Sequence, residues 1–112
     1  MDLKLAIPTN QGLLCDHFGH CEKFAIIEVK DNQIIKEEFA VPPNHQPGIY
    51  PGFLKDLGVD VVLAAGMGSR ALQLFDGLGI KVCTGVRSAP TRLLAEEYIE
   101  GKLVSSSNLC DH

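Results

Sequence analysis

Four side chains that can bind a metal lie within seven residues near the start of the sequence: Cys15, His17, His20 and Cys21. Thiolate and imidazole are ligands for iron, copper and zinc, so the donor types alone do not select the metal. Structural zinc sites usually place paired cysteines closer together in sequence than this C-x5-C spacing does. We therefore expect this segment to supply only part of a metal site.

The same segment also permits an interpretation without a metal. Phe18 would then pack into the core, Gly19 would allow a tight turn, and the polar side chains would cap nearby backbone groups. Both interpretations stay open for His20 and Cys21, whereas the metal interpretation is favoured for His17.

A glycine-containing turn is a second candidate site. The segment Gly66-Met67-Gly68-Ser69-Arg70 lies between an apolar run and a helix-like segment, where free backbone N–H groups can face an anion. Glycines at such turns also serve close packing of strand and helix. The turn alone therefore does not establish an anion site.

The arginines strengthen the case for an anionic ligand. The sequence has three of them, Arg70, Arg87 and Arg92, and each follows a predicted parallel strand or lies in the first helical turn beyond it. A cation in a first helical turn opposes the helix dipole, so three of them there suggest a negative ligand nearby. The alternative is surface ion pairing. The candidate partners are Asp60, Asp76, Glu96 and Glu97.

Four more candidate ligands lie in less specific surroundings. His45 stands in a proline-rich loop, and Cys110 and His112 lie among the last residues. Cys83 ends an apolar run and fits the pattern of a small buried residue. The sequence does not decide whether these four join the site.

Apolar periodicity predicts the elements that position these residues. Helices are expected over 50–57, around 71–78 and around 91–98, with Ser88 as a candidate N-cap of the third and Gly101 as its end. Five strands are expected, at 3–7, 24–30, 34–41, 59–65 and 80–83.

The order βββαβαβα predicts an α/β domain over residues 1–104 with a five-stranded mixed sheet, followed by a tail at 105–112. Ligands of open α/β sheets collect beyond the carboxyl ends of the parallel strands. Those ends carry Asn10, the 66–70 turn and Arg87, so we expect these residues to line the binding site.

Composition excludes several classes of protein. The 112 residues are 46% hydrophobic and 21% charged, which predicts one folded domain. A net charge of -4 gives no basic surface for nucleic acid. No run has the length of a membrane span, and 1–8 lacks the apolar stretch of a signal peptide. We therefore expect the cytoplasm, where thiols or metal ligands are favoured over disulfides.

The motifs resemble one known family over roughly residues 3–104. The resemblance rests on the first strand ending in Ile7-Pro8, the His17-Phe18-Gly19 motif, and Gly66-Met67-Gly68 followed by a helix and the segment 79–82. In these features the sequence resembles the dinitrogenase iron-molybdenum cofactor biosynthesis family. That family includes NifX/NifY/NafY-like domains, the C-terminal domain of NifB and the related orange protein.

The resemblance implies a ribonuclease H-like three-layer fold and a cluster-binding loop. It implies that His17 ligates or contacts the cluster, that Phe18 and Gly19 shape the loop, and that the 66–70 turn lines the same pocket. Cys15, His20 and Cys21 depart from the family pattern, which suggests a richer ligand set or another metal. The C-x3-C-x2-C motif of full NifB is absent, so cluster synthesis by that chemistry is excluded.

The resulting hypothesis is a carrier and not an enzyme. It would hold an iron–sulfur-type cluster, either iron-molybdenum cofactor, its precursor or a related sulfide cluster with molybdenum, copper or iron, and exchange it with metallocluster donor and acceptor proteins. The alternative is a metal-binding or regulatory module for zinc or a simple iron–sulfur centre. Two-metal nuclease chemistry is disfavoured because 3–7 and 61–65 contain no carboxylate.

Overall fold

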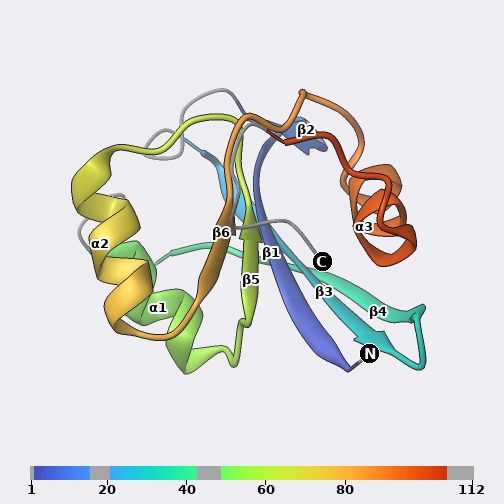
Figure 1. Ribbon diagram of the computed structural model, residues 1–112, viewed down its shortest axis with the longest axis horizontal. Coiled ribbons are helices and arrows are strands. Elements are labelled where there is room, and N and C mark those ends of the chain that lie inside the picture. The colour runs from blue at the N-terminus through green and yellow to red at the C-terminus, as the bar shows by residue number, and fades with distance from the viewer. Residues whose placement is uncertain (1, 16–20, 43–48, 106–112) are drawn as a thin grey trace.

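The computed structural model describes residues 2–15, 21–42 and 49–105. Its elements follow one another as shown in Figure 1. The strands are β1 (Leu3–Asn10), β2 (Leu13–Leu14), β3 (Lys23–Lys30), β4 (Gln33–Ala40), β5 (Val61–Leu63) and β6 (Lys81–Cys83). The helices are α1 (Tyr50–Asp56), α2 (Ser69–Gly77) and α3 (Thr91–Glu100).

The structure has three layers, with α1 and α2 on one face of a mixed sheet and α3 on the other (Figure 1). The sheet order is β4-β3-β1-β5-β6. Strands β1, β5 and β6 are parallel, whereas β3 pairs antiparallel with both β1 and β4. This arrangement confirms the predicted mixed α/β fold with ribonuclease H-like topology.

The predicted strand count is wrong by one because of β2, which pairs antiparallel with the end of β1. The turn between them is Gln11-Gly12, and both residues have positive φ, 55° and 83°. Two consecutive positive φ values define the tight hairpin turn whose twist matches paired strands. Strand β2 has two residues, which is too few for an alternation of apolar and polar residues to be recognised in the sequence.

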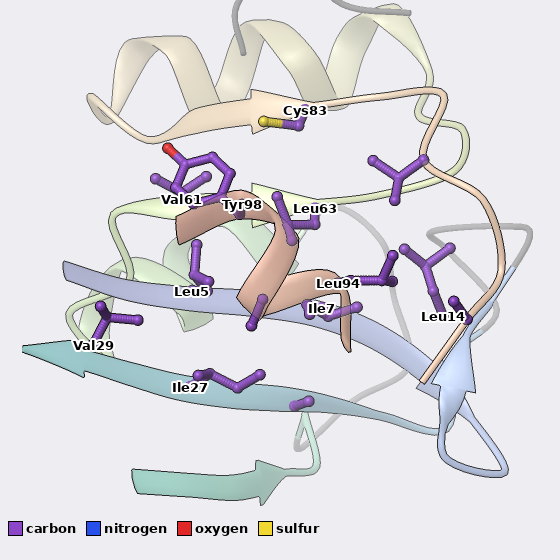
Figure 2. Close-up of a cluster of buried hydrophobic side chains, with 14 residues drawn as sticks. Leu5, Ile7, Leu14, Ile27, Val29, Val61, Leu63, Cys83, Leu94 and Tyr98 are labelled. Atoms are coloured by element: carbon purple, nitrogen blue, oxygen red, sulfur yellow. The ribbon is translucent and has the colours of Figure 1, made fainter. Parts of the chain in front are cut away.

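One apolar cluster lies between the sheet and α3. Figure 2 shows Leu94 and Tyr98 of α3 packed over side chains of β1 and β5. Leu94 is completely buried, as are Leu5 and Leu63 beneath it. This packing fixes the face of α3 and confirms the helical stripe predicted at 91–98.

A second apolar cluster lies between the sheet and α1 and α2. Phe24, Leu54 and Phe75 are its large fully buried side chains, together with Tyr50 at the start of α1. This cluster also holds Cys15 and Cys21. These two candidate metal ligands therefore belong to the α1/α2 face.

The start of α3 differs from the prediction, whereas its end agrees. The N-cap residue is Pro90, without a side-chain cap, and the Ser88 hydroxyl instead donates to the Leu14 carbonyl at 2.8 Å. Gly101 ends the helix in the left-handed conformation, with φ 74°. Ser88 therefore connects β2 to the approach of α3 and does not cap the helix.

None of the helices in the described ranges combines the length and hydropathy needed to cross a membrane.

Candidate metal-binding site

The carboxyl end of β1 anchors both ends of the predicted metal-binding loop. On one side of β1, the Cys15 N–H donates to the Pro8 carbonyl at 2.9 Å. On the other side, the Glu22 N–H donates to the Thr9 carbonyl at 2.9 Å and to the Asn10 side-chain oxygen at 2.7 Å. Cys15 and Cys21 therefore enter the site from the two flanks of the same strand.

Asn10 has a positioning contact that the sequence did not predict. Its side chain is exposed and accepts from the backbone N–H of Glu22, the residue that follows Cys21. The Glu22 carboxylate in turn accepts from the Gln11 N–H at 3.0 Å. This reciprocal pair holds the chain at the point where it rejoins the sheet.

Cys15 and Cys21 form a buried thiol pair. Their exposed fractions are 5% and 3%, and neither is in a disulfide. The hydrogen bond from the Cys21 thiol to Cys15 raises the pKa of Cys21 far above its usual range, and burial and the nearby charge of Cys15 act in the same direction. Cys21 therefore keeps its proton at neutral pH.

Tyr50 is buried in the same apolar cluster as this pair. Burial, followed by the charges of Cys21 and Cys15, raises the pKa of its phenol. The ring is held edge-on to Phe24, with centroids 5.2 Å apart. The sequence indicated Tyr50 only as a helix-face residue, because no local pattern shows that α1 begins beside the end of β1.

The glycine turn reaches the same apolar cluster. Met67 is half-buried and packs against the cluster that contains Cys15 and Cys21. Gly68 is the N-cap residue of α2, without a side-chain cap, and Ser69 and Arg70 are exposed in the first turn of the helix. Met67 therefore connects this turn to the core that contains Cys15 and Cys21.

Gly68 is not required by the backbone. Its φ is -67°, which any residue adopts. A Cβ added there would meet no atom within 4 Å. Within the described chain, the absent side chain leaves free space beside the start of α2.

The arginines do not share one site. Arg87 forms a bidentate ion pair with Glu97 of α3, at 2.8 and 2.7 Å, so the surface ion pair is the correct interpretation for this residue. This hydrogen-bonded pairing raises the pKa of Arg87 and lowers that of Glu97. Arg92 is also on α3, whereas Arg70 is on α2 across the sheet. The expected cluster of cations is therefore divided between the two faces.

Several candidate ligands lie outside the described residues: His17, Phe18, Gly19, His20, His45, Cys110 and His112. In the ranges that are described, no group of three or more His, Cys, Asp or Glu side chains is placed to hold a metal ion. Cys83 is fully buried and disulfide-bonded, so the expectation of a free thiol or ligand is wrong for this cysteine. A metal site at Cys15 and Cys21 thus requires further donors.

A surface cavity of about 350 Å³ lies away from the thiol pair. It is formed by the β3–β4 turn and α3, with Asn32, Arg92 and Glu96 among its lining residues. Its lining includes no sulfur or imidazole, so it does not match the chemistry of a soft metal.

With fold and site in view, a family can be assigned. The chain belongs to the dinitrogenase iron-molybdenum cofactor family, whose sequence model matches residues 1–101. This assignment confirms the resemblance seen in the motifs.

Relatives with known sequences or structures cover nearly the whole chain. The uncharacterized protein MJ0580 of Methanocaldococcus jannaschii is 28% identical over 106 residues, which are 90% of this chain and 89% of that protein. The crystal structure of PH0822 has a TM-score of 0.86 and 29% identity, covering 98% of this chain and 100% of that one.

The orange protein of Desulfovibrio gigas, solved in its apo form, has a TM-score of 0.77 at 18% identity and covers 94% of this chain and 93% of its own. At that identity the likeness shows a shared fold.

Proposed function

We propose that this chain binds an iron–sulfur-type metal cluster as cargo and passes it between metallocluster donor and acceptor proteins. The cargo would be iron-molybdenum cofactor, its precursor, or a related sulfide cluster of molybdenum, copper or iron. The observation that supports the proposal is that Cys15 and Cys21 lie in one apolar cluster against which Met67 packs, in a chain of this family.

The donor set suits such a cargo. Thiolates and thioethers are soft ligands that favour copper(I), zinc and iron–sulfur clusters. We propose that Cys15 and Cys21 supply one or two bonds and that His17 and His20 add imidazole donors. Few covalent bonds permit later release, which a carrier needs and an enzyme with a resident cofactor does not.

Charge on the cargo would be balanced from the α1/α2 face. Sulfide clusters are anionic, and the start of α2 offers backbone N–H groups beside Arg70. Arg87 is committed to Glu97 on the other face. We therefore assign the electrostatic role to Arg70 and the 66–70 turn, and give Arg87 no role in the site.

Anaerobic reconstitution tests the carrier. The purified chain is mixed with iron, sulfide and molybdate under reduction, desalted, and analysed for metal, sulfide and visible absorbance. The proposal expects a coloured chain that retains iron and sulfide. A colourless chain with stoichiometric zinc after isolation without oxygen would instead support the alternative metal-binding module.

Two matched pairs of variants locate the site. The double variant Cys15→Ser and Cys21→Ser should abolish retention, while Thr91→Ser, in α3 on the other face of the sheet, should not. Arg70→Ala should weaken retention more than Arg87→Ala, because only Arg70 shares a face with the thiols. Equal retention by all four variants would remove the cluster from this end of the sheet.

The variant Gly68→Ala tests whether the cargo occupies the space beside the start of α2. The backbone tolerates this change, so circular dichroism and thermal unfolding should match the parent chain. If the cargo approaches the turn closely, the added methyl group should lower cluster retention. Unchanged retention would place the cargo away from the turn.

A further inference from the structure

The surface cavity between α3 and the β3–β4 turn combines charged, amide and apolar side chains. Figure 1 shows this turn below α3. The apolar part of the cavity consists of Ile34 and Ile99, which are half-buried and pack against the apolar cluster of the α3 face. Its volume of about 350 Å³ is near the lower end of the range for small-molecule sites. A ligand of this cavity must therefore be small.

Both walls of the cavity are held in place by contacts elsewhere in the fold. The buried side chains of Leu94 and Tyr98 fix α3 on the sheet. The turn has two consecutive residues with positive φ, Asp31 at 52° and Asn32 at 62°, as a tight hairpin turn requires. The Asp31 N–H also donates to the Asp2 side chain at 3.1 Å. The cavity is therefore formed before any ligand binds.

Three exposed charged side chains line the α3 side of the cavity: Arg92, Glu96 and Glu100. They are spaced four residues apart, which is about 6 Å along the helix axis per step. In the described ranges, no ion pair or side-chain hydrogen bond joins Arg92 to either glutamate, whereas Arg87 and Glu97 are joined at 2.8 and 2.7 Å. An arginine four residues before a glutamate is in the weaker order for pairing. These charges are thus available to a ligand.

We propose that this cavity binds a short apolar peptide whose two ends are free, of which a dipeptide is the smallest. The Arg92 guanidinium binds the terminal carboxylate, and Glu96 and Glu100 bind the terminal ammonium. This binding site is separate from the metal cargo and does not depend on the proposed function.

The remaining lining residues suit the middle of such a ligand. The side-chain amides of Asn32 and Gln33 offer donors and acceptors to the peptide group. Ile34 and Ile99 offer apolar surface to a side chain of the ligand. An extended dipeptide spans about 7 Å, which lies between one and two steps of the charged series on α3. A single amino acid has no peptide group, so it uses less of the cavity.

An NMR titration of the full chain without metal tests this proposal. Backbone N–H spectra are recorded with alanyl-leucine, with leucine, and with N-acetyl-alanyl-leucine amide, in which both ends are blocked. We expect saturable shifts from the dipeptide, largest at residues 31–34 and 92–100. The blocked peptide should bind at least about fivefold more weakly, the factor that one exposed ion pair supplies at the top of its usual range.

The ligand series also defines the contrary result. Equal binding by the blocked peptide or by leucine would overturn the proposal, because the cavity would then not recognise the two free ends or the peptide group. The absence of any saturable shift at millimolar dipeptide would overturn it as well.

Variants of the charged residues test each end of the peptide separately. Arg92→Gln should weaken binding of alanyl-leucine by at least about fivefold and leave binding of alanyl-leucine amide, which has no carboxylate, unchanged. Glu96→Gln with Glu100→Gln should weaken alanyl-leucine likewise and leave N-acetyl-alanyl-leucine, which has no ammonium, unchanged. Glu97→Gln, on the same helix but outside the cavity lining, is the control and should bind as the parent chain does.

Circular dichroism checks that each variant folds, which is expected because Arg92, Glu96 and Glu100 are exposed. If the Arg92 and the glutamate variants both bind alanyl-leucine as tightly as the parent chain, these charges do not hold the peptide and the proposal fails.

Discussion

Both faces of the sheet are covered by an apolar core, but they differ in where their polar groups lie. On the α3 face, polar groups are joined at the edge of the core: Arg87 with Glu97, and the Thr91 hydroxyl, which donates to Glu37 at 3.0 Å. On the α1/α2 face, two free thiols and a phenol lie inside the core, those of Cys15, Cys21 and Tyr50.

This difference indicates where reactivity resides. Exposed ion pairs keep their charges hydrated and contribute little to stability. Buried thiols and a phenol are costly to ionise, so they remain neutral until a metal or an oxidant changes their chemistry. The α3 face therefore completes the fold, and the α1/α2 face combines folding with a reactive site.

The largest expected effects come from the cores themselves. Phe75 in α2 and Leu94 in α3 are both fully buried. Phe75→Ala should destabilise the chain by about 3–5 kcal/mol and Leu94→Ala by about 2–5 kcal/mol, because each leaves a cavity. Urea denaturation monitored by circular dichroism measures both. A loss under about 1 kcal/mol at either site would show that this face packs loosely.

Removing the Tyr50 hydroxyl should have a moderate effect. Tyr50→Phe removes a buried hydroxyl near Cys21 and Cys15, and the change in stability should stay within about 1.5 kcal/mol, the usual range for one buried polar interaction. The free thiols should also react faster with an alkylating reagent, because their surroundings are less fixed. Tyr98→Phe on the α3 face is the control, and it should leave thiol reactivity unchanged.

Alkaline pH should destabilise both faces through their tyrosines. Burial raises the pKa of Tyr50 and of Tyr98 above the ordinary value of 10.0. A group with a raised pKa in the folded state stabilises the fold fully below its unfolded pKa, and this contribution is lost as pH rises through the folded pKa. Stability should therefore decline above about pH 10.

Phenolate absorbance checks this prediction. The chain has two tyrosines and no tryptophan, so the signal reports these two rings alone. It should rise together with unfolding and not before it. If the phenolate signal developed near pH 10.0, the ordinary pKa of tyrosine, while the chain was still folded, the raised pKa of these two groups would be contradicted.

The smallest expected effect belongs to the ion pair. Arg87 lowers the pKa of Glu97 by hydrogen bonding, so the contribution of this carboxylate is present above its unfolded pKa and lost as pH falls through the folded value. Glu97→Gln should change the urea midpoint little at neutral pH and should reduce its dependence on acid. A large loss at neutral pH would mean that the pair organises α3.

Features that depend on neighbouring residues could be predicted from the sequence. Features that depend on contacts between residues far apart in the chain could not. Gly101 ends α3 as predicted because a left-handed cap favours glycine regardless of surroundings. Ser88 looked like an N-cap, yet its hydroxyl binds Leu14, 74 residues away. No periodicity shows such a partner. The same reason hid that Tyr50 is buried in one core with Cys21.

For the site, the sequence predicted the segments but not how they are grouped. Cys15 and Cys21 belong to one apolar cluster on the α1/α2 face, and Met67 packs against it. The arginines divide because successive crossovers place α2 and α3 on opposite faces, and spacing along the chain does not reveal which face a helix will cover. The roles of His17 and His20 stay predictions.

The short strand β2 mechanically joins the reactive loop to the opposite layer. Leu14 donates from its N–H to the Ala89 carbonyl at 3.1 Å and accepts from Ser88 at 2.8 Å, while the next residue is Cys15. Pulling Cys15 outward must therefore stretch bonds that lead directly into α3. A strain produced on one side of the molecule is transmitted through this strand to the other.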